Sequence, residues 1–303
     1  MATQDILHQV RSMGCGIDPV AMRQLYAGAS YGPIAYGKRF NDVRYGDHLR
    51  HRLDIYLPQP DDTLRPVVVF LHGGGFVRGD KSERSQVGHF FARHGFVTVL
   101  ANYRLAPECR WPAGAEDVAA VLAWVQQHIA EYGANPSRIF LIGESAGAAH
   151  AAAATLVQKF HLSKSLMLSG LVLISGVYNP KLEYLARQQF GIPTPDPRND
   201  AYFGDNSGEY DGQCVVDLAD AAPFPLLITY AELDPAQMQV QAGELFARLV
   251  TQRGFQPALK VIEAHNHLSQ IGSLGTDDVR LSSVLLDFIH QQLDSLSQIR
   301  SSR

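Results

Sequence analysis

Apolar runs and amphipathic stretches alternate along most of this chain, beginning near residue 43. The apolar runs are short and rich in Val, Ile and Leu, which is typical of strands buried on both faces. Most of the stretches between them carry apolar residues at helical spacing. This alternation predicts a mostly parallel sheet with helices on both faces. The strands are expected at residues 53–57, 67–71, 97–102, 139–142, 170–174, 226–230 and 259–262.

Glycines mark the ends of two predicted helices. One helix is expected over residues 115–132 and stops at Gly133, and another over residues 237–253 stops at Gly254. A glycine just past the last helical residue commonly ends a helix, because glycine adopts the left-handed conformation without strain. The chain is expected to close with an amphipathic helix over residues 277–296.

Two segments, about residues 1–40 and 177–223, interrupt this alternation and are not expected to contribute strands to the sheet. The second segment is rich in Pro, Gly, Asp and Asn, yet it also carries large apolar side chains that a solvated linker does not need. These side chains are Tyr178, Leu182, Tyr184, Leu185, Phe190, Tyr202 and Phe203. Insertions at the carboxyl ends of strands lie over the ligand-binding edge of an open α/β sheet. We therefore predict a single domain over residues 1–303 in which both segments form a cap.

The overall charge excludes several classes of partner. The chain is 46% hydrophobic and 18% charged, with a net charge of -4 and no extended basic run. It therefore lacks an electrostatic footprint for nucleic acid or for an anionic membrane surface. No 18 apolar residues run together, and the first residues lack the basic flank and apolar core of a secretory signal. We expect a cytoplasmic protein that binds neither nucleic acid nor membranes, and a homodimer is compatible with the sequence.

The three cysteines, Cys15, Cys109 and Cys214, are far apart in the chain. Their number and spacing fit neither a disulfide framework nor close-spaced zinc ligands. We interpret them as packing residues, and we expect neither a metal ion nor a cofactor.

The segment Gly143-Glu144-Ser145-Ala146-Gly147 follows the strand predicted over residues 139–142 and opens an Ala-rich helical stretch. A Gly-x-Ser-x-Gly segment in that context is typical of a nucleophile elbow, whose glycines let the chain turn sharply and expose the serine hydroxyl. A five-residue pattern of this kind also occurs by chance, so the prediction depends on the strand before it and the helix after it. Ser145 is the predicted nucleophile.

A serine nucleophile needs a base, a group that orients this base, and donors for the oxyanion that forms. The segment His72-Gly73-Gly74-Gly75-Phe76 follows the strand predicted over residues 67–71. A glycine run alone is more often a flexible turn, but after a strand it can aim backbone N–H groups at a substrate carbonyl oxygen. We predict the N–H groups of Gly74, Gly75 and Ala146 as the oxyanion hole.

His267, just after the last predicted strand, is the predicted base, and its neighbour His265 is the rival. Two histidines one residue apart also occur as metal ligands, but no further cluster of ligand residues accompanies this pair. Hydrolases with this elbow order their triads along the chain as serine, acid and histidine. That order favours a histidine in this late position.

Asp234 follows the strand predicted over residues 226–230 and is the predicted acid. This architecture places catalytic groups at strand ends. The carboxylate would accept the Nδ1–H of the base and hold the imidazole in the productive tautomer. An aspartate before a proline, here Pro235, is also a common turn former. Glu232 is the substitute candidate.

With these residues identified, the chain resembles the hormone-sensitive-lipase-like branch of the α/β-hydrolase carboxylesterases over roughly residues 50–290. A third motif supports the resemblance, and it comprises Asn102-Tyr103-Arg104-Leu105-Ala106-Pro107-Glu108, Trp111-Pro112-Ala113 and Glu116-Asp117. The resemblance implies an α/β-hydrolase fold with a small cap. It also implies the same site residues, which are Ser145, Asp234 and His267 with Gly74, Gly75 and Ala146.

The sequence departs from that family beside the triad. Asp234 is followed by Pro235-Ala236-Gln237 where relatives commonly have proline, leucine and a charged pair. His267 is followed by Leu268-Ser269 where many relatives have glycine and an aromatic residue. These differences bear on the shape of the acyl pocket more than on the chemistry. Glu144, at the variable position of the elbow, is interpreted as a structural anchor without a part in proton transfer.

The predicted function is a serine carboxylesterase that forms an acyl-enzyme and acts on a small-molecule ester. The short, polar and proline-broken cap favours short acyl chains over emulsified fat. One alternative is an arylformamidase or a related amide hydrolase, which uses a similar set of Ser, Asp and His. The other is a non-catalytic ligand receptor on the same fold. A receptor is expected to have a broken triad, whereas Ser145 and His267 are both present.

Overall fold

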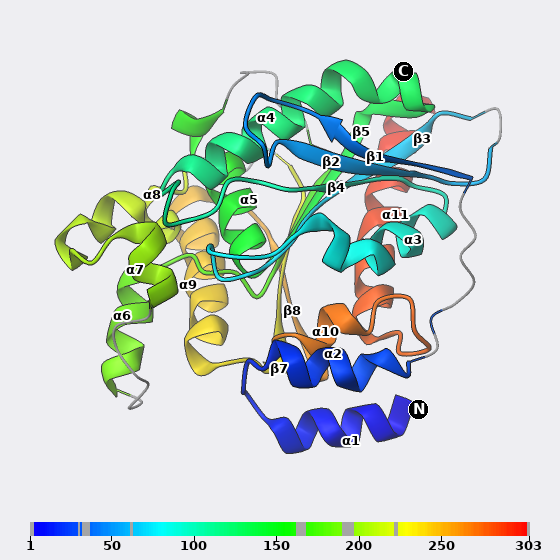
Figure 1. Ribbon diagram of the computed structural model, residues 1–303. Helices are drawn as coiled ribbons and strands as arrows, with labels where there is room; N and C mark the ends of the chain where they lie inside the picture. The colour runs from blue at the N-terminus through cyan, green and yellow to red at the C-terminus, as the bar shows by residue number, and fades with distance from the viewer. Residues whose placement is uncertain are drawn as a thin grey trace.

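The computed structural model describes residues 3–29, 31, 37–60, 63–161, 168–189, 197–220 and 224–301. Within these residues an eight-stranded sheet has the order β1-β2-β4-β3-β5-β6-β7-β8, and helices cover both of its faces (Figure 1). The strands are β1 (Lys38–Arg44), β2 (Arg52–Leu57), β3 (Arg65–Leu71), β4 (Val97–Ala101), β5 (Ala134–Glu144), β6 (Gly170–Ile174), β7 (Leu226–Leu233) and β8 (Ala258–Asn266).

Strands β3 to β8 form the parallel body of the sheet, and β2 and β1 extend it in antiparallel pairing. Each of the seven predicted strands coincides with one of β2 to β8, so the expectation of a mostly parallel sheet is confirmed. Strands such as β3 and β6 are buried over most or all of their length, which explains their apolar sequences.

Strand β1 (Lys38–Arg44) corrects the expectation that the first 40 residues contribute nothing to the sheet. It lies at the edge, pairs only with β2, and is exposed or half-buried along its length. The register shifts between Phe40 and Val43, where Asp42 has a positive φ of 56°. A polar edge strand with a bulge loses the alternation of apolar and polar residues, which is why its sequence does not indicate a strand.

The predicted helices are present with small changes at their ends. Residues 115–132 form most of α4 (Ala113–His128) and the 3₁₀ turn η2 (Ile129–Tyr132), and the final helix is α11 (Arg280–Ser301). Gly133 and Gly254 both have a left-handed backbone, with φ of 75° and 70°, as predicted for glycines that end helices. The remaining helices of the body are η1 (Lys81–Arg84), α3 (Ser85–Arg93), α5 (Ala146–Leu156), η3 (Gln158–Phe160), α9 (Ala236–Arg253) and α10 (Ser269–Gly272).

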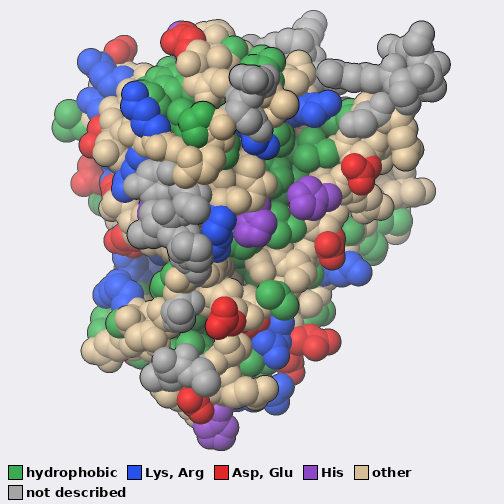
Figure 2. Space-filling model, turned by 90° about the vertical axis from the view of Figure 1, so that its right-hand side faces the viewer, with side chains coloured by type: hydrophobic (Ala, Val, Ile, Leu, Met, Phe, Trp, Pro, Cys, Tyr) green, Lys and Arg blue, Asp and Glu red, His purple; other side chains and the backbone are tan. Residues whose placement is uncertain are grey.

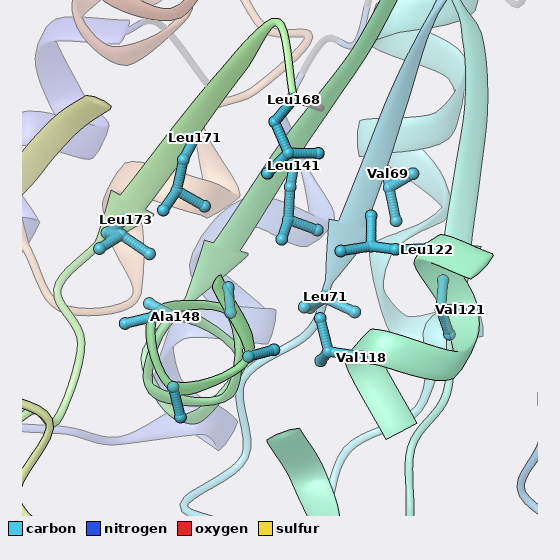
Figure 3. Close-up of a cluster of buried hydrophobic side chains, with 14 of the residues drawn as sticks. Val69, Leu71, Val118, Val121, Leu122, Leu141, Ala148, Leu168, Leu171 and Leu173 are labelled. Atoms are coloured by element: carbon cyan, nitrogen blue, oxygen red, sulfur yellow. The ribbon is translucent and has the colours of Figure 1, made fainter. Parts of the chain in front are cut away.

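The strands bury alternate side chains in two cores, one on each face of the sheet. Val69 and Leu71 of β3 pack on one face with side chains of α4, α5 and α9, such as Val118 and Ala148 (Figure 3). Phe70, on the opposite face of the same strand, packs with side chains of α3 and α11. The two cores fix the strands relative to one another, and thereby also the loops at their carboxyl ends.

The two segments that interrupt the alternation form helices. The first contains α1 (Thr3–Met13) and α2 (Pro19–Ala27), which pack against β8 and α10 through a small apolar cluster that includes Val10 and Leu25. The second contains α6 (Pro180–Gln189), α7 (Pro197–Phe203), η4 (Ser207–Gln213) and α8 (Val215–Leu218). Of its apolar side chains, Tyr178, Tyr202 and Phe203 are buried, Leu182 is half-buried, Tyr184 and Leu185 are exposed, and Phe190 lies outside the described residues.

Charged side chains of both signs are interspersed on the face shown in Figure 2, in keeping with the small net charge. No helix among the described residues is long and apolar enough to span a membrane. Cys214 is buried in the core, as expected of a packing residue, and Cys109 is half-buried. Cys15 is exposed, so its predicted packing role is wrong.

Candidate active site

Ser145 stands at a sharp turn between β5 and α5 (Ala146–Leu156), with φ of 51° and ψ of -119°. A non-glycine residue in a sparsely populated region of this kind costs about 1–3 kcal/mol and persists only where its surroundings hold it. The flanking glycines permit the turn. A Cβ on Gly143 would lie 2.5 Å from the carbonyl oxygen of Gly147, and a Cβ on Gly147 would lie 2.4 Å from that of Leu71. This is the geometry expected of a nucleophile elbow.

The three predicted triad residues lie side by side at the ends of three strands. Ser145 Oγ is 2.9 Å from His267 Nε2, and His267 Nδ1 is 2.7 Å from Asp234 Oδ1. Ser145 follows β5, Asp234 follows β7, and His267 follows β8. With Nδ1–H donated to the carboxylate, Nε2 is the nitrogen that accepts the serine proton.

His267 and Asp234 are both buried, which strengthens their interaction. Burial is the largest influence on the pKa of His267 and lowers it. The Asp234 carboxylate beside the ring acts in the opposite direction, and the charges of Glu144 and Glu183 add to its effect. Together they raise the pKa of His267 above its ordinary value of 6.5.

The rival residues have other partners. His265 is fully buried, with Nδ1 2.9 Å from Ser269 Oγ and Nε2 3.3 Å from Asp278 Oδ2. Glu232 accepts the backbone N–H of Ala264 at 2.6 Å. The geometry therefore favours His267 and Asp234 over His265 and Glu232 as partners of the serine.

The glycine-rich loop brings backbone N–H groups beside Ser145. Gly74 and Gly75 both have positive φ, 142° and 59°, and a Cβ on Gly74 would lie 1.9 Å from the carbonyl oxygen of Arg78. In the part of the chain that the structure describes, no hydrogen bond occupies the N–H groups of Gly74, Gly75 or Ala146. All three residues line the same pocket as Ser145. These N–H groups are available to an oxyanion.

A buried network holds this loop in shape. Tyr103, from the third sequence motif, donates its hydroxyl to the carbonyl of His72 at 2.6 Å and stacks on the His72 ring. His72 Nδ1 lies 2.7 Å from the carbonyl oxygen of Gly73. Burial chiefly, assisted by the positive charges of Arg50 and Arg84, lowers the pKa of His72 to about 4. His72 is therefore neutral near pH 7, so its Nδ1 carries the proton donated to Gly73.

Glu144 anchors the loop to the elbow. Its Oε1 accepts the N–H of Gly73 at 2.8 Å and the Nε–H of Arg84 at 2.6 Å. The carboxylate is buried and compensated by both donors. These contacts agree with the interpretation of Glu144 as a structural anchor.

Two residues of this network escaped the sequence analysis. Ser175, directly after β6, donates its hydroxyl to Asp234 Oδ2 at 2.5 Å, and the Ala231 N–H donates to the same oxygen at 2.8 Å. Gln270 Nε2 in turn donates to Ser175 Oγ at 2.6 Å. With Oδ2 occupied in this way, Oδ1 of Asp234 is left for His267. Only the position of Ser175 after a predicted strand could have indicated it, because no motif includes it.

The pocket beside Ser145 has a volume of about 160 Å³. Both segments that interrupt the strand and helix pattern contribute to its wall, Ile17 and Arg23 from the first and Val177 and Asn199 from the second. Among the residues that the structure describes, no three His, Cys, Asp or Glu side chains are arranged to hold a metal ion.

The order of the strands and the elbow between β5 and α5 define an α/β-hydrolase fold. Solved structures of other proteins share this fold. Esterase B from Lactobacillus rhamnosis superposes with a TM-score of 0.77 and 18% identity over 99% of this chain and 97% of that chain. A hyperthermophilic esterase from the archaeon Pyrobaculum calidifontis superposes with a TM-score of 0.69 and 20% identity over 98% of this chain and 94% of that chain.

Sequence comparisons cover parts of the chain. The BD-FAE family model matches residues 53–169. A probable isoprenylcysteine alpha-carbonyl methylesterase from Arabidopsis thaliana is 39% identical over 117 residues, which are 39% of this chain and 24% of that protein. An acetyl esterase from Salmonella choleraesuis (strain SC-B67) is 31% identical over 192 residues, 60% of this chain and 58% of that protein. The chain thus spans about a quarter of the plant relative and somewhat over half of the bacterial one.

Proposed function

We propose that this protein is a serine carboxylesterase. The observation that carries the proposal is the hydrogen-bonded line from Ser145 through His267 to Asp234, beside three unoccupied backbone N–H groups. Nucleophile, base, orienting acid and oxyanion donors are the four parts that acyl transfer requires. The relatives and solved structures named above are esterases, which supports the same reaction class.

In the proposed mechanism Ser145 Oγ attacks the ester carbonyl while His267 Nε2 takes the serine proton. The oxyanion accepts hydrogen bonds from the N–H groups of Gly74, Gly75 and Ala146. The tetrahedral intermediate then collapses, the carbon–oxygen bond to the alcohol breaks, and His267 returns its proton to the departing oxygen. Water, activated by the same histidine, attacks the acyl-enzyme and releases the carboxylic acid. Asp234 stabilises the imidazolium in both halves of the cycle.

We propose that residues from both interrupting segments act as a cap and restrict the acyl group to a short chain. The pocket of about 160 Å³ is smaller than the roughly 300–1,000 Å³ of typical ligand pockets. Val177 and Met238 are among its apolar lining residues, and Arg198, Asn199 and Gln237 are among its polar ones. A small-molecule ester with a short acyl chain fits this space.

The test is hydrolysis of p-nitrophenyl acetate by Ser145→Ala, with Ser283→Ala, at an exposed position of α11, as a matched control. We expect the first variant to lose hydrolysis and to keep the unfolding temperature, and the second to behave as the parent protein. Turnover retained by Ser145→Ala would remove the serine from its role. Hydrolysis of formylkynurenine faster than that of an aryl butyrate would favour the arylformamidase alternative instead.

A further inference from the structure

A second and larger cavity adjoins the pocket of Ser145. Its volume is about 530 Å³, within the usual range for small-molecule sites. Five residues line both cavities, so the two spaces meet along a shared border. The shared residues are Pro19, Arg23, Glu83, Arg84 and Leu268. The mechanism described above uses only the smaller space.

One face of α2 forms a wall of this cavity. Its lining residues recur at the spacing of a single helix face, and they are Pro19, Met22, Arg23, Tyr26 and Ala27. Leu268, Ile271 and Gly272 form a second wall, and a third side includes Gln86.

Away from the shared border the lining is apolar except for Gln86 and the hydroxyls of two tyrosines. The hydroxyl of Tyr26 donates to the carbonyl of Ser269 at 3.0 Å, and that of Tyr31 donates to the carbonyl of Gly272 at 3.1 Å. Because both hydroxyls are engaged by backbone carbonyls of α10, the aromatic rings supply the lining. Rings and aliphatic side chains favour an apolar, ring-containing group.

The position of the cavity identifies which half of an ester it would receive. His267 must return its proton to the departing alcohol oxygen, so the alcohol lies on the histidine side of the reacting carbonyl. Leu268, which follows His267 directly in the chain, lines the second cavity, and so do Ile271 and Gly272 of the next helix, α10. Val177 and Met238 line the smaller pocket and not the second cavity, so we assign the acyl group to their side of the reacting carbonyl.

We propose that the second cavity binds the alcohol part of the substrate, and that this alcohol carries an apolar ring-sized group. The inference rests on the proposed esterase function. The smaller pocket beside Ser145 would hold a short acyl group, and the larger cavity along α2 would hold a bulky alcohol. Arg23 lies at the border of the two spaces.

The experiment compares kcat/KM for ethyl, benzyl and 2-naphthylmethyl acetates, which share one acyl group. Because each buried CH₂-sized group contributes about 0.8 kcal/mol, or roughly fourfold, we expect the two ring-bearing esters to exceed ethyl acetate by at least about tenfold. Ala27→Trp and Gln86→Trp fill the cavity from two different walls. Each variant should remove this advantage, and its kcat/KM for ethyl acetate should stay within about twofold of the value for the parent protein.

The matched control is Val20→Trp, because Val20 lies on the same helix, is 55% exposed and lines neither cavity. It should leave all three values unchanged. Competitive inhibition by 2-naphthylmethanol, lost in the filled variants, provides a second measurement. Equal kcat/KM for the three esters, or an advantage retained in both filled variants, would overturn the subsite. Absence of hydrolysis for every ester would instead contradict the proposed function.

Discussion

At the scale of single residues, the protonation of His267 sets the pH dependence of the proposed reaction. The neighbouring carboxylates raise the pKa of its imidazole above 6.5 despite burial. Only neutral His267 can take the proton of Ser145, so activity falls as the pH drops through this pKa. We expect the acid limb of a kcat/KM profile to have its midpoint above pH 6.5. A midpoint at or below that value would show that the ring is not held by Asp234 as described.

Ser175 gives a second residue-level prediction, because its hydroxyl fixes one oxygen of Asp234. Ser175→Ala removes a hydrogen bond to a charged group, worth about 1.5–3 kcal/mol, so we expect kcat/KM to fall by about tenfold or more with KM nearly unchanged. Without this donor the carboxylate charge acts more fully on His267, and the acid limb should move to higher pH.

The matched control is Ser169→Ala, at the opposite end of β6, which should change neither kcat/KM nor the acid limb. If Ser175→Ala lowers stability but does not shift the acid limb of the pH profile, Ser175 contributes only to packing and does not position Asp234.

At the scale of elements, local sequence patterns reveal the parts of the site that lie within one segment. The glycine-rich loop and the elbow are contiguous, so Gly74, Gly75 and Ser145 could be predicted from the residues around them. Ser175 and Gln270 could not, because their contacts join β6 to α10 across 95 positions. Strand β1 was missed for a different reason, since its polar residues and bulge leave no apolar alternation.

The oxyanion loop provides a prediction at this scale. Gly74→Ala places a methyl group against the carbonyl of Arg78 in a positive-φ position, so the loop must shift. Loss of one oxyanion donor costs about a hundredfold to a thousandfold in kcat, and we expect a loss of at least that size. Gly243→Ala is the control, because no atom lies within 4 Å of the added methyl group on α9. The control should keep its activity and gain about 0.5–1 kcal/mol in stability. Equal kcat values for both variants would contradict the assignment.

At the scale of the whole molecule, the order of the strands builds the site. Four adjacent strands, β5, β6, β7 and β8, end next to one another, and the residues after them are Ser145, Ser175, Asp234 and His267. The parallel arrangement that the Val, Ile and Leu runs predicted therefore also explains how residues up to 122 positions apart meet. The size of the pocket could not be predicted in the same way. It depends on how α2 and α7 pack over the strand ends, and no single segment encodes this packing.

Covalent labelling with a fluorophosphonate, followed by peptide mapping, tests the central claim most directly. The reagent reacts with a serine only where a base and oxyanion donors activate it. We expect the label on the peptide that contains Ser145, and we expect His267→Ala to slow the labelling at least about a thousandfold while His265→Ala does not. A label on a different serine, or labelling of Ser145 that is indifferent to His267, would contradict the account.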